Sequence, residues 1–112
     1  MEIIYEQRSS KRLPFYNRIL ILLNPEGYFA ASTFNISQNG IGMKSNLDIP
    51  VGTKISAHLF FDSVICEVEG KIEWSSKNPS DNSFKMGVHL LRVTDEFNEI
   101  YHRINRKFKN TL

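Results

Sequence analysis

Apolar and polar residues alternate along most of the stretch from Val64 to Trp74, and this pattern constrains the fold more than any other feature of the sequence. One set of alternate positions, which ends at Trp74, is apolar or glycine, and the other set is mostly charged. A period of two is typical of a β-strand with one face in the core and one in water. We predict a long strand here, with Trp74 on the core face and Gly70 at a bend or bulge.

Shorter stretches elsewhere in the chain also have the composition of strands. They alternate or are rich in aliphatic, aromatic and β-branched residues, and they cover residues 18–23, 28–36, 40–44, 53–61 and 84–90. Turn-forming residues separate them, as at 24–27 and 37–40, where Asn, Pro, Ser and Gly gather. The chain is therefore expected to be mainly β.

The period changes after Thr94. Apolar residues then recur at helical spacing, at Phe97, Ile100, Tyr101, Ile104 and Phe108. Thr94 is suited to cap the helix, with acidic residues directly after it and lysines near residue 109, which complements the helix dipole. We predict an amphipathic helix over residues 94–109, packed on a small antiparallel barrel or sandwich.

Length and composition limit the function as well as the fold. With 112 residues, the chain is predicted to form a single domain over residues 1–112. Its net charge of +2 is too small for a protein that coats nucleic acid, so any basic site must be local. The longest aliphatic run, residues 19–23, is far shorter than the ~20 residues of a membrane helix, and the acidic N-terminus does not resemble a signal peptide. We expect a cytoplasmic domain without membrane insertion.

Enzymatic chemistry finds little support in the sequence. The histidines His58, His89 and His102 are scattered over two predicted strands and the helix, without metal-ligand spacing. Cys66, the single cysteine, shares the apolar face of its strand, where packing explains it better than nucleophilic catalysis. Neither a nucleophile elbow nor a phosphate-binding loop occurs. We predict a protein that is not an enzyme and that holds no metal and no cofactor.

Two short motifs remain, and each is weak by itself. Arg8 and Arg12 lie four residues apart on a polar, aperiodic segment, and an arginine guanidinium binds phosphate or a guanine edge with two parallel hydrogen bonds. Asn35 and Ser37 follow at the end of a predicted strand, where both side chains can project to one side, and Gly40 allows a close approach. Alone, the first motif is an ordinary basic tail and the second an ordinary turn.

Together, in this order, the motifs resemble those of the PilZ domain family. Arg-x-x-x-Arg at 8–12 is followed by Asn-x-Ser-x-x-Gly at 35–40. The glycine-plus-aliphatic stretch 40–43, the turn 50–53 and the stretches 70–74 and 86–90 are also similar to family segments. The resemblance spans residues 6–104. It implies a six-stranded antiparallel β-barrel with a C-terminal helix, a receptor for cyclic di-GMP, and no catalytic activity.

The resemblance also implies roles for individual residues. Arg8 and Arg12 would grip the phosphodiesters and guanine edges of cyclic di-GMP, while Asn35, Ser37 and Gly40 would bind a guanine on the barrel surface. Trp74 occupies a position where some relatives contact or stack on a guanine, and a residue at the rim of a barrel can also pack inward.

The chain departs from the common family pattern at two positions. Gln7 stands where many relatives carry a further arginine, and the neighbouring Lys11 could supply charge but no bidentate fork. Asn35 replaces the commoner aspartate, so its contacts to guanine would differ. These departures leave open the affinity and whether the ligand is a monomer or an intercalated dimer.

Residues 1–13 are predicted to be a flexible segment that the ligand orders, creating a surface for an unidentified downstream protein effector. One alternative is a degenerate member of the family that binds proteins but no nucleotide. A second is a barrel for single-stranded nucleic acid, which would need aromatics interleaved with a basic groove. Because the basic residues gather toward the chain ends and most aromatics lie on core faces, we expect no nucleic-acid polymer as partner. An enzyme is the least supported alternative.

Overall fold

The computed structural model describes residues 11–23 and 27–110 of the chain. In this part, the strands and the helix follow one another in the order β1 (Leu13–Pro14), β2 (Arg18–Leu23), β3 (Gly27–Ser37), β4 (Gly40–Ser45), β5 (Lys54–Phe61), β6 (Val64–Lys77), β7 (Phe84–Leu90) and α2 (Asp95–Asn110). The expectations that concern residues 1–10, including Gln7 and Arg8, lie outside the described residues.

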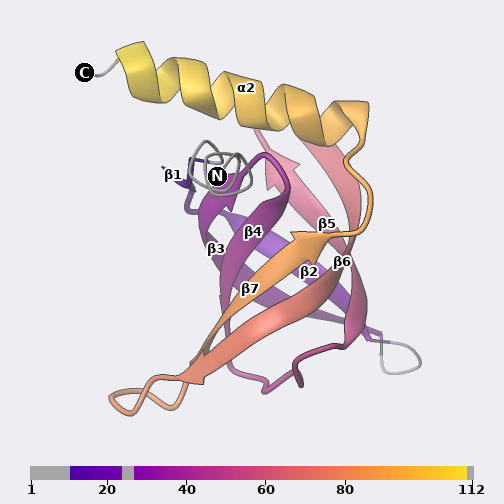
Figure 1. Cartoon of the computed structure of the whole chain (residues 1–112), viewed down its shortest axis with the longest axis vertical. Helices are drawn as coiled ribbons and strands as arrows, with labels where there is room; N and C mark the ends of the chain where they lie inside the picture. The colour runs from indigo at the N-terminus through magenta and orange to yellow at the C-terminus, as the bar shows by residue number, and fades with distance from the viewer. Residues whose placement is uncertain (1–10, 24–26, 111–112) are drawn as a thin grey trace, which may run out of the picture.

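Strands β2 to β7 close into an antiparallel barrel (Figure 1). The hydrogen-bonded order is β3-β2-β5-β6-β7-β4, and β4 returns to β3 to complete the circle. The eleven-residue strand β3 makes this closure possible, because residues 27–32 pair with β2 and residues 32–37 pair with β4. The short strand β1 pairs with β3 near its C-terminal end, at Asn35 and Ile36. The predicted six-stranded barrel is therefore confirmed, with one further strand attached.

The core fills the inside of the barrel with alternate side chains from every strand. Fully buried side chains include Ile19, Ile21, Met43, Leu59, Ile72 and Met86. Each such aliphatic side chain contributes about 1.5–3 kcal/mol when it leaves water. Their neighbours along each strand project from the outer face, which is where a ligand could reach them.

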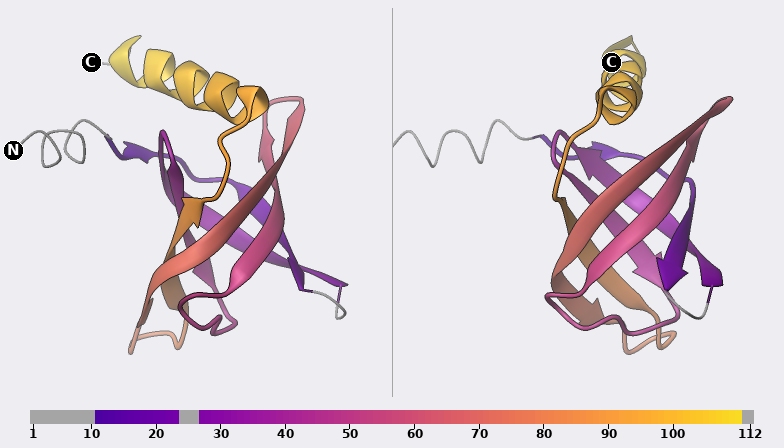
Figure 2. Two further views of the ribbon diagram at one scale, coloured as in Figure 1. Left: turned by 45° about the vertical axis from the view of Figure 1, so that its right-hand side comes forward. Right: turned by 90° about the vertical axis from the view of Figure 1, so that its right-hand side faces the viewer.

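Helix α2 lies across one end of the barrel, as both views of Figure 2 show. On the face of the helix that meets the barrel, Phe97 and Ile100 are fully buried, and Tyr101 and Ile104 are also buried. The backbone N–H of Phe97 donates to Thr94 Oγ1 at 3.2 Å, as expected for an N-cap residue. The predicted C-terminal amphipathic helix is thus present, and it begins at Asp95, directly after its cap. It is not long and apolar enough to span a membrane, and neither is any other helix in the described part of the chain.

Two strands contain a bulge, and one of these corrects the sequence prediction. The register of β6 against β7 shifts between Ile72 and Trp74, so Glu73 and Trp74 both project outward. Trp74 is 39% exposed, so it does not lie on the core face that the alternation indicated, and of the two roles left open for it, core packing is excluded. The second bulge, between Thr33 and Asn35, interrupts the pairing of β3 with β4.

Gly70, the predicted position of a bend, keeps regular pairing with both neighbouring strands. A side chain there would meet Val88 and the backbone oxygen of His89, so this glycine allows strands to approach closely. Leu13 also differs from expectation. It was predicted to end the flexible segment 1–13, but it is only 3% exposed and pairs with Ile36.

Candidate functional site

Four residues form a continuous row across the outer face of the barrel. Asn35 on β3 lies opposite Gly42 on β4, Gly42 lies opposite Gly87 on β7, and Gly87 lies opposite Trp74 on β6. We call Asn35, Gly42, Gly87 and Trp74 the central row. The two bulges lie at its ends, and each places two consecutive residues on the outside: Phe34 with Asn35, and Glu73 with Trp74.

The two glycines of the central row allow larger side chains to approach the sheet closely. A Cβ atom at Gly42 would lie 2.5 Å from Asn35 Oδ1 and 2.7 Å from Cζ of Phe34. A Cβ atom at Gly87 would collide with the indole ring of Trp74. Both contacts are closer than real side chains tolerate, so neither position accepts a side chain without movement of its neighbour. The Asn35 amide and the Trp74 indole therefore rest above neighbouring strands, whose spacing is about 4.8 Å.

Arg12 joins the central row at its β3 end. Its Nη1 donates a hydrogen bond to Asn35 Oδ1 at 3.2 Å, across 23 residues of sequence. Strand β1 determines this position, because Leu13 pairs with Ile36 and Pro14 pairs with Asn35. The structure thus brings together one residue from each of the two motifs that were predicted to bind the ligand. Lys11 is exposed beside Arg12.

Ser37 and Gly40 lie two residues along their strands from Asn35 and Gly42, and they pair with each other at the β3–β4 turn. Ser37 is buried, and its hydroxyl lies 3.4 Å from Asn39 Oδ1 and 3.5 Å from the backbone oxygen of Gly40. A Cβ at Gly40 would lie 3.0 Å from the backbone oxygen of Val88. These residues therefore shape the turn next to the row, and Ser37 faces into that turn.

Basic residues border the central row on its other side. Ser32, Lys44 and Lys85 pair in succession on β3, β4 and β7, each two or three residues along its strand from the central row. Arg18 on β2 pairs with Ser32 and extends this line of residues. Lys44 Nζ forms an ion pair with Asp81 Oδ2 at 3.0 Å. Lys85 Nζ lies over the ring of Phe34, 5.2 Å from its centroid. We call Arg18, Lys44 and Lys85 the basic row.

Sequence reasoning did not identify Phe34, Gly42, Lys85 or Gly87 as parts of this surface. A signal for the glycines does exist, since each occupies an outward position in a strand that is otherwise rich in larger residues. Glycine inside a strand often marks a close approach. The alignment of the two glycines with Asn35 and Trp74 depends on strand register, which the spacing of residues in one strand does not show.

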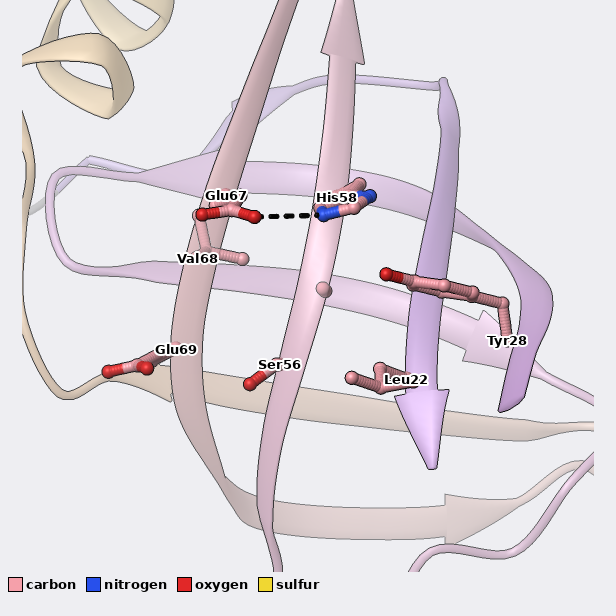
Figure 3. Close-up of a pocket in the computed structure, with 8 residues that line it drawn as sticks. Leu22, Tyr28, Ser56, His58, Glu67, Val68 and Glu69 are labelled. Atoms are coloured by element: carbon pink, nitrogen blue, oxygen red, sulfur yellow. Dashed lines mark hydrogen bonds and ion pairs between the residues drawn. The ribbon is translucent and has the colours of Figure 1, made fainter. Parts of the chain in front are cut away.

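A separate pocket of about 200 Å³ lies over β2, β5 and β6 (Figure 3). Its walls include Leu22, Tyr28, His58 and two carboxylates, Glu67 and Glu69. The dashed line in Figure 3 marks the contact between His58 Nε2 and Glu67 Oε2 at 3.2 Å. The two carboxylates disfavour an anionic ligand. The central row with its basic border is therefore the better candidate for binding an anion.

Metal and thiol chemistry find no support in the described structure. No group of three His, Cys, Asp or Glu residues within 11–23 and 27–110 could hold a metal ion. Cys66 is buried, and this burial raises the pKa of its thiol, so that the unreactive thiol form dominates near neutral pH.

The outer surface described above belongs to a β-barrel that carries a helix at one end, and comparison with known proteins identifies its family. The model of the PilZ domain matches residues 6–105, and the chain belongs to the PilZ domain family. PilZ domains are in general non-enzymatic receptors for cyclic di-GMP that also bind effector proteins.

Among solved structures, the chain is similar to the inhibitor of motility MotI/DgrA from Bacillus subtilis, with 17% sequence identity and a TM-score of 0.74. The similarity covers 92% of this chain and 52% of that one, so the chain spans about half the length of MotI/DgrA. At this identity the likeness shows the fold alone. No curated protein matches the chain.

Proposed function

We propose that this protein is a non-enzymatic receptor for cyclic di-GMP, and that the nucleotide binds across the central row. The observation that carries the proposal is the hydrogen bond between Arg12 and Asn35, because it unites the two ligand motifs at one end of a surface floored by glycine. Membership of the PilZ domain family supports the choice of ligand.

The chemistry of the central row suits a dianionic ligand with two flat bases. The guanidinium of Arg12 can bind a phosphate oxygen or the O6 and N7 atoms of guanine. Asn35 accepts the Arg12 hydrogen bond through Oδ1, which leaves its amide nitrogen to donate to the ligand. Arg8 is proposed to contribute the second guanidinium. Ser37 and Gly40 shape the adjacent turn, and Gln7 and Lys11 flank the arginines as further contacts.

Trp74 is proposed to stack on one guanine. The Nε1 side of its indole lies against Gly87 and the side chain is 39% exposed, so part of the ring is supported by the sheet while part is open to a base. Stacking of a base on an aromatic side chain is worth about 1–3 kcal/mol. Asn35 lies over the neighbouring strand position, so that one purine could contact both residues.

Binding is proposed to act as a switch that relays the signal to a partner protein. The two phosphates would hold Arg8 next to Arg12 over the central row and so fasten the segment 7–12 to the barrel surface. The new arrangement of this segment would be the surface that a downstream effector recognises. Amide hydrogen exchange with and without cyclic di-GMP measures this, and unchanged protection of residues 7–12 at saturation would reject the relay.

Calorimetric titration with cyclic di-GMP tests the binding site itself. Arg12→Ala and Asn35→Ala should each weaken binding about tenfold or more, because each removes a hydrogen-bonded contact, charge-assisted in the case of arginine. Arg106→Ala, at an exposed arginine on helix α2, is the matched control and should bind like the wild type. The titration also gives the molar ratio. Wild-type protein that binds no cyclic di-GMP would instead support a module that binds only proteins.

A further inference from the structure

We propose that Lys85 is a phosphate-binding residue of the same surface, and that Phe34 holds its side chain in position. This inference rests on the proposed function and adds to it a residue that lies in neither ligand motif. Lys85 is on β7, two residues before Gly87, and it projects from the outer face of the barrel.

The aromatic ring of Phe34 places the Lys85 ammonium next to the central row. The bulge between Thr33 and Asn35 puts Phe34 on the outer face, where its ring lies against Gly42. Lys85 Nζ lies 5.2 Å from the centroid of that ring, so the side chain of Lys85 extends from β7 toward β4. Arg12, through Asn35, and Lys85, through Phe34, therefore both lie beside Gly42.

The charges around Lys85 leave it available to an anion. Lys44 lies directly opposite Lys85, and like charges at opposed positions on neighbouring strands destabilise a sheet. Asp81 neutralises Lys44 through an ion pair at 3.0 Å. Lys85 has no carboxylate partner in the part of the chain that the structure describes, and its ammonium makes a cation–π contact with the ring of Phe34. A contact of this kind is weak at an exposed site, and a phosphate can replace or supplement it.

The position of Lys85 complements the chemistry of the ligand. Cyclic di-GMP carries two phosphates, whereas among the described residues one cation, Arg12, is hydrogen-bonded to the central row. Lys85 adds a second cation whose placement comes from the folded sheet rather than from residues 7–12. The ammonium is a compact charge with three donors, which suits a phosphate oxygen better than a guanine edge.

Calorimetric titration with cyclic di-GMP at two salt concentrations tests this role. Lys85→Met should weaken binding about tenfold and make it less sensitive to salt, because one charge contact is lost. Lys85→Arg should stay within about threefold of the wild type, because the charge remains. Phe34→Leu keeps Lys85 but removes the aromatic ring that holds it, and it should weaken binding less than Lys85→Met.

Lys107→Met is the control, because Lys107 Nζ lies 5.0 Å from the ring centroid of Phe61 and so makes the same kind of contact elsewhere. It should leave binding unchanged. If Lys85→Met binds cyclic di-GMP with the affinity and salt dependence of the wild type, the role of Lys85 is overturned but the proposed function is not. Absence of binding by the wild type would overturn both. A thermal unfolding midpoint for Lys85→Met equal to that of the wild type would show that the loss is not due to misfolding.

Discussion

The indole of Trp74 covers the Cα atom of Gly87, its partner on the neighbouring strand. A side chain at position 87 would occupy the space that the ring now fills. The bulge at Glu73 brings the indole to the outer face, and the glycine gives it room against the sheet, so a strand irregularity and a glycine together place an aromatic ring on this surface. Because Trp74 is the only tryptophan of the chain, its fluorescence reports on this surface directly.

Gly87→Ala should displace the indole from the sheet. The ring is partly exposed and can swing toward solvent, so we expect the emission maximum to shift to longer wavelength while the free energy of unfolding changes by less than about 1.5 kcal/mol. Binding of cyclic di-GMP should weaken, because the base would lose its stacking partner. Fluorescence and calorimetry measure these effects. Lys77→Ala, at an exposed position on the strand of Trp74, should change neither the emission maximum nor the affinity. An unchanged emission spectrum for Gly87→Ala would contradict the packing of the indole against Gly87.

Thr94→Ala should destabilise the protein by about 1 kcal/mol, because Phe97 would lose the side-chain acceptor of its N–H at the start of α2. Urea unfolding followed by circular dichroism measures the difference. Thr94→Ser retains the hydroxyl and should recover most of the loss. Equal stability of Thr94→Ala and the wild type would show that the cap contributes nothing.

Cys66 should react slowly with thiol reagents in the folded protein. Burial is the largest cause of its raised pKa, and the hydrogen bond with Thr94 opposes the shift. Since the unfolded thiol ionises first, near pH ~8.5, the raised pKa favours the folded state below that pH, and this contribution is lost as the pH rises toward the folded pKa. Labelling rates with and without urea test this, and equal rates at pH 8 would contradict it.

Asp81 should stay ionised well into the acid range. The Ser83 hydroxyl at 2.6 Å and the Ser83 N–H at 3.0 Å are the main reasons for its lowered pKa, followed by Lys44. A carboxylate with a lowered pKa stabilises the fold above its unfolded pKa of about 3.9, and this contribution is lost as the pH falls toward the folded pKa. NMR titration of the carboxyl carbon measures the shift. Asp81→Asn should lose less stability than the wild type between neutral and acid pH.

The barrel and the helix were predictable because both depend on local periodicity. Alternation along β5 and β6 follows directly from burial of one strand face, and the stripe that contains Phe97 and Ile100 follows from burial of one helix face. These patterns repeat within a few residues, so a single stretch of sequence carries them.

The candidate site was predictable only in part. The order of the two motifs predicted that Arg12 and Asn35 bind one ligand, but not that they form a hydrogen bond with each other. The exposure of Trp74 was not predicted, because one extra residue at Glu73 moves each later side chain of the strand to the opposite face of the sheet. The alignment of Gly42 with Gly87 likewise depends on the pairing of β4 with β7, which are far apart in the chain.

Strand β1 consists of two residues, yet it fixes the place of Arg12 at the proposed binding surface. Leu13 is paired in the sheet, so a single peptide bond separates Arg12 from a fixed point of the fold. Most of the conformational entropy of placing that backbone, about 1–2 kcal/mol per residue, is therefore lost when the domain folds rather than when the ligand arrives. The guanidinium is present at the surface at a high effective concentration. Affinity for the nucleotide should consequently depend on the integrity of a strand that need not touch it.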